Sequence, residues 1–66
     1  MTIYLEKVNS RWYGTCYQIS TEYSDPYIYP NTITAKEAIA AYEKDRRCKV
    51  NKAFELVRGA YKEVKI

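Results

Sequence analysis

Hydrophobic and polar positions alternate through the first part of the chain, and this period of two predicts strands. Residues 3–9 and 12–19 form two such stretches, rich in aromatic and β-branched side chains. Asn9 and Ser10 lie between them, and because Asn tolerates a positive φ, this pair predicts a tight hairpin turn. A short third strand is expected at 27–29, where a proline on each side suits the edge of a sheet better than its centre.

The expected turn decides which side chains share a face of the sheet. A two-residue loop pairs Ile3 with Cys16 and Leu5 with Gly14 on one face. This face holds the aliphatic residues, so we expect it to lie under a helix, with Trp12 covering its end. The opposite face then carries three phenols, those of Tyr4, Tyr13 and Tyr17.

A helix is predicted in the middle of the chain. Thr34 and Glu37 have the spacing of a capping box, in which each side chain accepts a backbone N–H at the start of a helix. Beyond Thr34, apolar residues recur at the spacing of one helical face. They are Ala35, Ala38, Ile39 and Tyr42. We therefore expect a helix over residues 35–47.

Residues 51–58 allow two interpretations. Phe54 and Leu56 alternate as in a strand, whereas Leu56 and Val57 also fit the apolar face of a helix. The aromatic and β-branched composition favours a strand, with a bend near Gly59.

Together these elements predict an α+β fold with a single domain over residues 1–66. Its order is strand, strand, strand, helix, strand, and one helix packs on a mainly antiparallel sheet of three to five strands in a two-layer sandwich. With 66 residues, 47% of them hydrophobic, the chain allows one small core and is neither disordered nor fibrous in composition. The expected core consists of Ile3, Leu5, Trp12, Ile39, Tyr42, Phe54 and Leu56.

The sequence also predicts the compartment of the protein. No apolar run approaches the roughly 20 residues that span a bilayer, so we expect no membrane partner. The first residues form no apolar signal-peptide segment, which predicts a cytoplasmic protein, in the host cytoplasm if a phage encodes it. In that compartment Cys16 and Cys48 are expected to be reduced thiols.

Catalytic and metal chemistry find few candidates in this chain. There is no His, the commonest general base and metal ligand. Cys16 and Cys48 lack a histidine base and are too few for a tetrahedral metal site. The carboxylates show no acid–base spacing, and the two glycines are too far apart to cradle a phosphate. We therefore expect a protein that is not an enzyme and holds no cofactor and no metal.

Positive charge is concentrated in the second half of the chain. The formal net charge is +3; residues 1–33 hold two basic and three acidic side chains, and residues 34–66 hold nine basic and five acidic ones. This cluster suits phosphates or acidic side chains, and it also suits the solvated end of a helix, where cations favour the negative end of the dipole. The clustered basic residues are Lys44, Arg46, Arg47, Lys49 and Lys52.

Tyrosine is abundant, with eight residues in the chain and six of them among the first 29. Tyrosine offers a large contact area at little cost in rotamer entropy and is enriched at interfaces. The alternative role is purely structural, as half-buried cross-strand pairs. The expected partner-binding residues are Tyr4, Arg11, Tyr13, Tyr17, Tyr27 and Tyr29.

Two segments resemble the layout of the AP2 DNA-binding domain, which phage integrase arm-binding domains share. They are residues 12–19 and residues 34–42, the latter with the pattern Thr-Ala-x-Glu-Ala-x-x-Ala-Tyr. The resemblance covers about residues 3–47 and implies three strands followed by a helix, with the sheet entering the major groove of DNA. Of that family's basic sheet, Lys7 and Arg11 stand in matching places.

Two functions follow from these observations. The first is a non-enzymatic protein that docks on another protein through its Tyr-rich sheet face, with the basic cluster assisting. In size it is similar to small phage proteins that inhibit or redirect host machinery, such as anti-CRISPR proteins and polymerase inhibitors. The second is a nucleic-acid-binding domain that uses the three-stranded sheet or the basic 44–52 segment. The free strand edges and exposed tyrosines also allow a homodimer.

Overall fold

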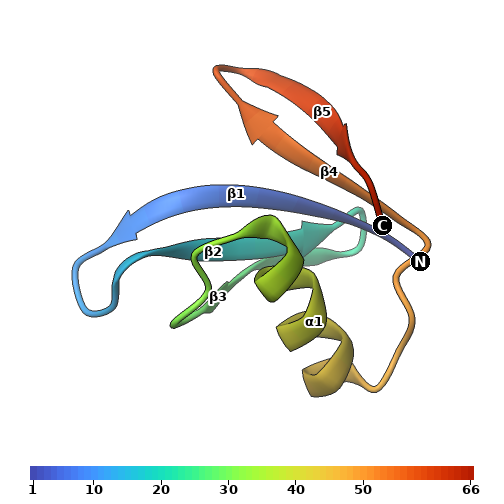
Figure 1. The fold of residues 1–66 in the computed structure, drawn as a ribbon, viewed down its shortest axis with the longest axis horizontal. Helices are drawn as coiled ribbons and strands as arrows, with labels where there is room; N and C mark the ends of the chain where they lie inside the picture. Colours follow the sequence, from blue (N-terminus) through green and yellow to red (C-terminus); the bar gives the residue numbers. More distant parts are fainter.

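The computed structural model describes all 66 residues as one sheet and one helix. The elements are β1 (Thr2–Ser10), β2 (Gly14–Thr21), β3 (Ser24–Tyr29), α1 (Ala35–Arg46), β4 (Lys52–Val57) and β5 (Ala60–Val64). The strands lie in the order β3-β2-β1-β4-β5, and α1 packs on one face of this sheet (Figure 1). The α+β architecture is therefore confirmed, and the tail forms two strands. The helix is too short and too polar to cross a membrane.

The helix begins where the sequence predicts. The Thr34 hydroxyl accepts the backbone N–H of Glu37 at 3.2 Å, and the Glu37 carboxylate accepts the N–H of Thr34 at 3.0 Å. These bonds satisfy donors that have no partner within the helix. The backbone hydrogen bonds hold the pKa of Glu37 below its ordinary value. At the other end Arg47 caps the helix in the left-handed conformation, with φ 51°.

The chain joins its two halves through a parallel pair of strands. β1 pairs with β4 in parallel, and the three other neighbouring pairs are antiparallel. A parallel pair needs a long crossover, which the connection containing α1 provides. The bend expected near Gly59 is the β4–β5 hairpin turn, where Arg58 and Gly59 both have positive φ, at 52° and 80°.

The β1–β2 turn differs from the prediction. Asn9 and Ser10 belong to β1, and the loop consists of the next three residues. The Ser10 hydroxyl accepts two backbone N–H groups of this loop at 3.2 Å each, and Gly14 closes it with φ 71°. A hydroxyl acceptor and a glycine in the left-handed region are typical of a three-residue hairpin loop. They stabilise the turn later in the chain than the Asn9-Ser10 pair suggested.

The observed β1–β2 register reverses which side chains of β2 face the helix. Cys16 pairs with Val8, and Tyr17 pairs with Lys7, so the shift is an odd number of residues. Side chains alternate between faces, and an odd shift therefore places Tyr17 on the helix side and Cys16 on the other. The predicted pairing of Ile3 with Cys16 was wrong for this reason.

The core lies between α1 and the sheet. Ile3, Leu5, Ile39 and Tyr42 are buried as expected. Trp12 is not in the core, because it lies in the β1–β2 turn. The buried residues outside the expected core are Tyr17, Ile19, Tyr29, Thr32, Ala38, Val50 and Ala53. Cys16 is buried as well, but on the face of β2 away from the helix, not on the helix side where the sequence prediction placed it.

Phe54 and Leu56 lie on the side of the sheet away from α1, which we call the open face. Phe54 pairs with Tyr4, and Leu56 pairs with Glu6, so neither side chain faces the helix. The Tyr4 ring stacks on Phe54 at 5.9 Å and meets the edge of Tyr61 at 5.3 Å between centroids. The β4–β5 hairpin swings away from the layers formed by α1 and β1–β3 (Figure 1). Phe54 and Leu56 are consequently only half-buried, and their assignment to the helix-side core was wrong.

Candidate protein-binding groove

Three of the expected partner-binding tyrosines have different positions from those predicted. Tyr17 is buried under the helix, where its hydroxyl donates to Glu55 Oε2 at 2.9 Å. Tyr29 is also buried, and its hydroxyl donates to Asp45 Oδ2 at 2.9 Å. Tyr13 is exposed, but it lies in the β1–β2 turn and not on the open face. Of the predicted phenol face, only Tyr4 lies on the open face, half-buried in the aromatic cluster.

A different surface brings several of the predicted residues together. An open groove of about 920 Å³ lies between edge strand β3 and the second half of α1, and we call it the β3–α1 groove. The residues that line it from the sheet side are Tyr13, Pro26, Tyr27, Ile28, Tyr29 and Pro30. The helix side contributes Ala41, Lys44, Asp45 and the C-cap residue Arg47. Tyrosines and basic residues that are far apart in the sequence therefore share one site.

The aromatic residues of the groove form a packed series. The Tyr29 ring meets Tyr27 edge-on at 5.3 Å and Tyr42 at 5.9 Å between centroids. Arg46 holds its guanidinium 5.9 Å from the centroids of both the Tyr27 and the Tyr42 rings. Edge-to-face and cation–π contacts of this kind fix the side chains beyond what burial alone does. The floor of the groove is therefore preformed.

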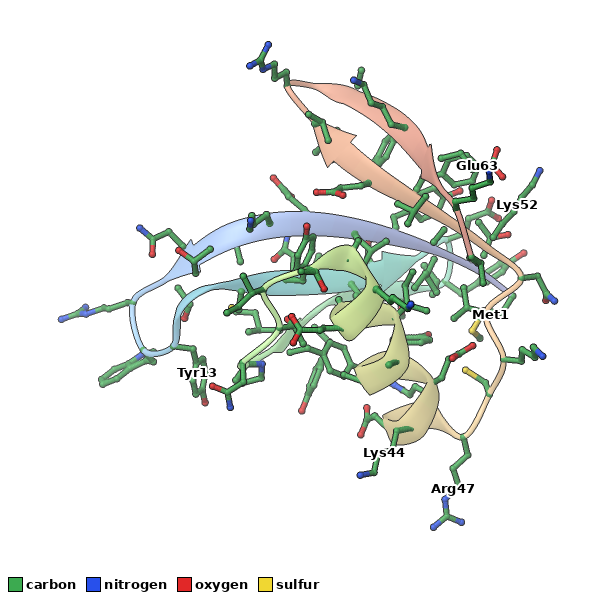
Figure 2. All side chains as sticks on the ribbon, in the orientation of Figure 1. Met1, Tyr13, Lys44, Arg47, Lys52 and Glu63 are labelled. Atoms are coloured by element: carbon green, nitrogen blue, oxygen red, sulfur yellow. The ribbon has the colours of Figure 1, made fainter.

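The charges at the groove divide into a paired and an unpaired set. Arg46 Nε lies 3.5 Å from Asp45 Oδ2, and this is the only ion pair in the structure. Burial raises the pKa of Tyr29, and the hydrogen bond to Asp45 acts in the same direction, whereas Arg46 lowers that pKa. Lys44 and Arg47 form no ion pair, and both point outward from the end of α1 (Figure 2). Two cations thus remain available for an external anion.

The β1–β2 turn, next to the groove, holds the most exposed aromatic side chain of this region. Trp12 is 82% exposed, and the Arg11 guanidinium lies 5.7 Å from its ring centroid. Tyr13, which is 58% exposed, continues from this turn into the groove. The sequence prediction assigned Trp12 to the core. The turn chemistry of Ser10 and Gly14 is the signal that would have placed it outside.

The rest of the predicted basic cluster does not gather at the groove. Figure 2 shows Lys52 near Glu63, apart from Lys44 and Arg47 at the end of α1. Lys52 begins β4, and Lys49 lies in the loop before it. Arg46 is held against aromatic rings, as described above. The contiguous stretch 44–52 is therefore not one surface patch.

Neither cysteine forms a disulfide; Cys16 is buried, and Cys48 follows the helix. No group of three or more His, Cys, Asp or Glu side chains lies close enough together to hold a metal ion. Comparisons of the chain with protein-family models, with curated proteins and with solved structures find no match. The groove and the turn beside it are therefore the features of the chain that bear on its function.

Proposed function

We propose that this chain is a non-enzymatic binding protein that docks on another protein through the β3–α1 groove and the adjoining turn. It would act as an inhibitor or modulator does, by covering part of the partner's surface. The observation that carries the proposal is the exposure of three large aromatic side chains, two in the groove lining and one in the adjoining turn. Trp12 is the one in the turn, and the groove lining contributes Tyr13 and Tyr27, which is 56% exposed.

Exposed aromatic residues in this number support a contact role. Trp and Tyr are the residues most often found among the energetically dominant positions of protein interfaces. Each offers a large apolar area with few rotatable bonds, so ordering it on binding costs little entropy. The preformed floor around Tyr29 lowers that cost further, because the contacting groups are already positioned.

A protein partner is favoured over duplex DNA by the charge of the open face. Lys7 is the only basic residue in β1, β2 and β3, and its Nζ lies on the helix side, 5.9 Å from the Tyr17 ring centroid. On the open face Gln18 Nε2 donates to Glu6 Oε1 at 3.0 Å. A sheet that follows a DNA groove neutralises several phosphates with Lys and Arg. The open face of these three strands offers no such cation.

Substitutions in the turn test the proposal without disturbing the core. Trp12→Ala and Tyr13→Ala each remove an exposed ring, and circular dichroism should show an unchanged fold. The matched control is Tyr23→Ala, which removes a ring that is 94% exposed in the β2–β3 turn, outside the groove lining. Proteins captured from a lysate of the source cells by the unmodified chain should be lost with the first two variants and kept with the third.

A gel-shift assay with mixed DNA and RNA, at low and high salt, tests the second function. Strong binding that falls steeply with salt would favour nucleic acid, because released counterions give that dependence. In the lysate experiment, capture of the same proteins by all three variants would contradict docking through this surface.

A further inference from the structure

We infer that the β3–α1 groove binds an acidic peptide segment of the partner, whose carboxylates meet Lys44 and Arg47 while an apolar side chain packs on Tyr13 and Tyr27. This inference rests on the proposed function and specifies the chemistry of the bound segment. It follows from the charges that the groove leaves unpaired, from the apolar side chains beside them and from the shape of its floor.

The charge at the rim is positive: Lys44, in the last turn of α1, and Arg47, its C-cap, both line the groove. Neither forms an ion pair in the structure. The helix dipole contributes only about half a negative charge at this terminus. Two full positive charges exceed it, and the rim attracts an anion.

Asp45 is the one carboxylate in the groove lining. Its Oδ2 accepts the Tyr29 hydroxyl at 2.9 Å and lies 3.5 Å from Arg46 Nε. The Asp45 and Arg46 charges therefore compensate each other inside the site. The uncompensated charge of the groove comes from Lys44 and Arg47, and its complement is an acidic ligand.

The groove also has an apolar wall. Pro26, Pro30 and the exposed ring of Tyr27 line the sheet side, and Ala41 lies across from them on the helix. An anion alone would leave these surfaces in contact with water. A peptide that carries an apolar residue next to an acidic one would cover both the wall and the rim, which gives the ligand its two required features.

The same geometry disfavours single-stranded nucleic acid as the occupant. Sequential bases stack on open aromatic faces beside a row of cations. Here the Tyr29 ring is buried, and Arg46 lies against the Tyr27 ring. The rim has two unpaired cations, too few to follow a phosphate backbone over several nucleotides.

Selection from a random-peptide display library tests the inference and does not require the partner to be identified. The unmodified protein should enrich peptides in which Asp or Glu neighbours an aromatic or aliphatic residue. A selected peptide, labelled with a fluorophore, should bind at least about fivefold more weakly to Lys44→Glu and to Arg47→Glu, and its amidated Asn/Gln version should also lose affinity. High salt should also weaken binding of the selected peptide, because salt screens the attraction between its carboxylates and the two cations.

Two further variants separate charge from folding. Arg47→Gly removes the guanidinium from a left-handed position that glycine adopts freely, so its fold is retained. It should weaken binding of the selected peptide as Arg47→Glu does. The double variant Lys62→Glu/Lys65→Glu changes the charge as much as Lys44→Glu/Arg47→Glu, at residues outside the groove lining, and should leave affinity within about twofold.

The outcomes distinguish this inference from the proposed function. Enriched peptides that lack acidic residues, yet lose binding with Trp12→Ala or Tyr13→Ala, would overturn the acidic ligand and leave the docking surface in place. Equal binding by the two double variants would also overturn the acidic ligand. No enrichment at all, or enrichment that survives both turn variants, would contradict the acidic ligand and the docking surface together. Preferential binding of oligonucleotides over every selected peptide would do the same.

Discussion

Tyr17 provides the sharpest test of the structure, because the sequence prediction placed this ring in solvent and the structure places it under the helix. It is 4% exposed, and its hydroxyl donates to Glu55 Oε2 at 2.9 Å. Burial raises the pKa of Tyr17 from the ordinary 10.0 to about 12, and the neighbouring Glu55 carboxylate acts in the same direction. The ionised phenolate is therefore much less stable in the folded state than in the unfolded one.

The sign of the pH dependence follows from this shift. A group with a higher pKa in the folded state releases its proton more readily on unfolding, so its contribution is complete below pH 10 and is lost between pH 10 and about 12. The pKa is about 2 higher in the folded state, and at about 1.36 kcal/mol per pKa unit this difference corresponds to about 3 kcal/mol in the free energy of unfolding. For a domain of this size, 1 kcal/mol shifts the melting temperature by about 4–8 °C.

The experiment compares Tyr17→Phe with the unmodified protein from neutral to alkaline pH. At neutral pH the variant loses a hydrogen bond to a half-buried carboxylate, which should cost about 1–2 kcal/mol. Above pH 10 its stability should fall less steeply than that of the unmodified protein, and ultraviolet absorbance should show one fewer late-titrating phenol. Tyr61→Phe, at an exposed position, serves as the control and should change neither property. Identical alkaline slopes for Tyr17→Phe and the unmodified protein would refute the buried position.

Three other substitutions test local features of the fold. Thr34→Ala removes the hydroxyl that accepts the Glu37 N–H and should lower the free energy of unfolding by about 1 kcal/mol in urea denaturation; no loss would mean that the capping box contributes nothing. Gly59→Ala places a side chain at φ 80° with open space around its Cβ, so backbone strain alone should cost about 1–2 kcal/mol, measured by thermal melting. Arg47→Gly relieves a left-handed arginine and should leave the melting temperature equal or higher; a marked decrease would contradict the cap geometry.

The helix could be predicted because its signals are local. The capping box at Thr34 and Glu37 lies within four residues, and the apolar spacing that follows it does not depend on the rest of the chain. The strands could also be located, since period two and β-branched composition are local properties. The predicted end at residue 47 and the observed end at Arg46 differ only by the C-cap residue.

The faces of the strands could not be predicted in the same way. The β1–β2 register depends on which of two competing turns is the more stable, and one odd shift moves Tyr17 from solvent to the core. The face of β4 depends on its parallel register with β1. Near the start of that pairing, the Met1 carbonyl accepts the N–H groups of Asn51 and Lys52 at 2.9 and 3.3 Å. Such long-range contacts leave no pattern in the local sequence.

The groove was beyond the sequence prediction because it exists only through topology. Tyr13, Tyr27 and Lys44 come from a turn, an edge strand and a helix, and the sheet order places these three elements together. The tyrosine and basic residues were singled out by type. Their division into buried, open-face and groove positions required the register and the crossover.

The exposure of Trp12 is the feature least easily explained by folding alone. Burying a tryptophan removes about 150–250 Å² from water, which at about 25 cal/mol per Å² is worth roughly 4–6 kcal/mol. A chain of 66 residues has only a small core and would benefit from that contribution, yet the turn holds the ring in solvent. Pro26 lies within edge strand β3 and Pro30 directly follows it, and residues without an N–H limit uncontrolled strand pairing there. An exposed aromatic side chain near a proline-containing edge strand is the combination that the proposed docking surface would need.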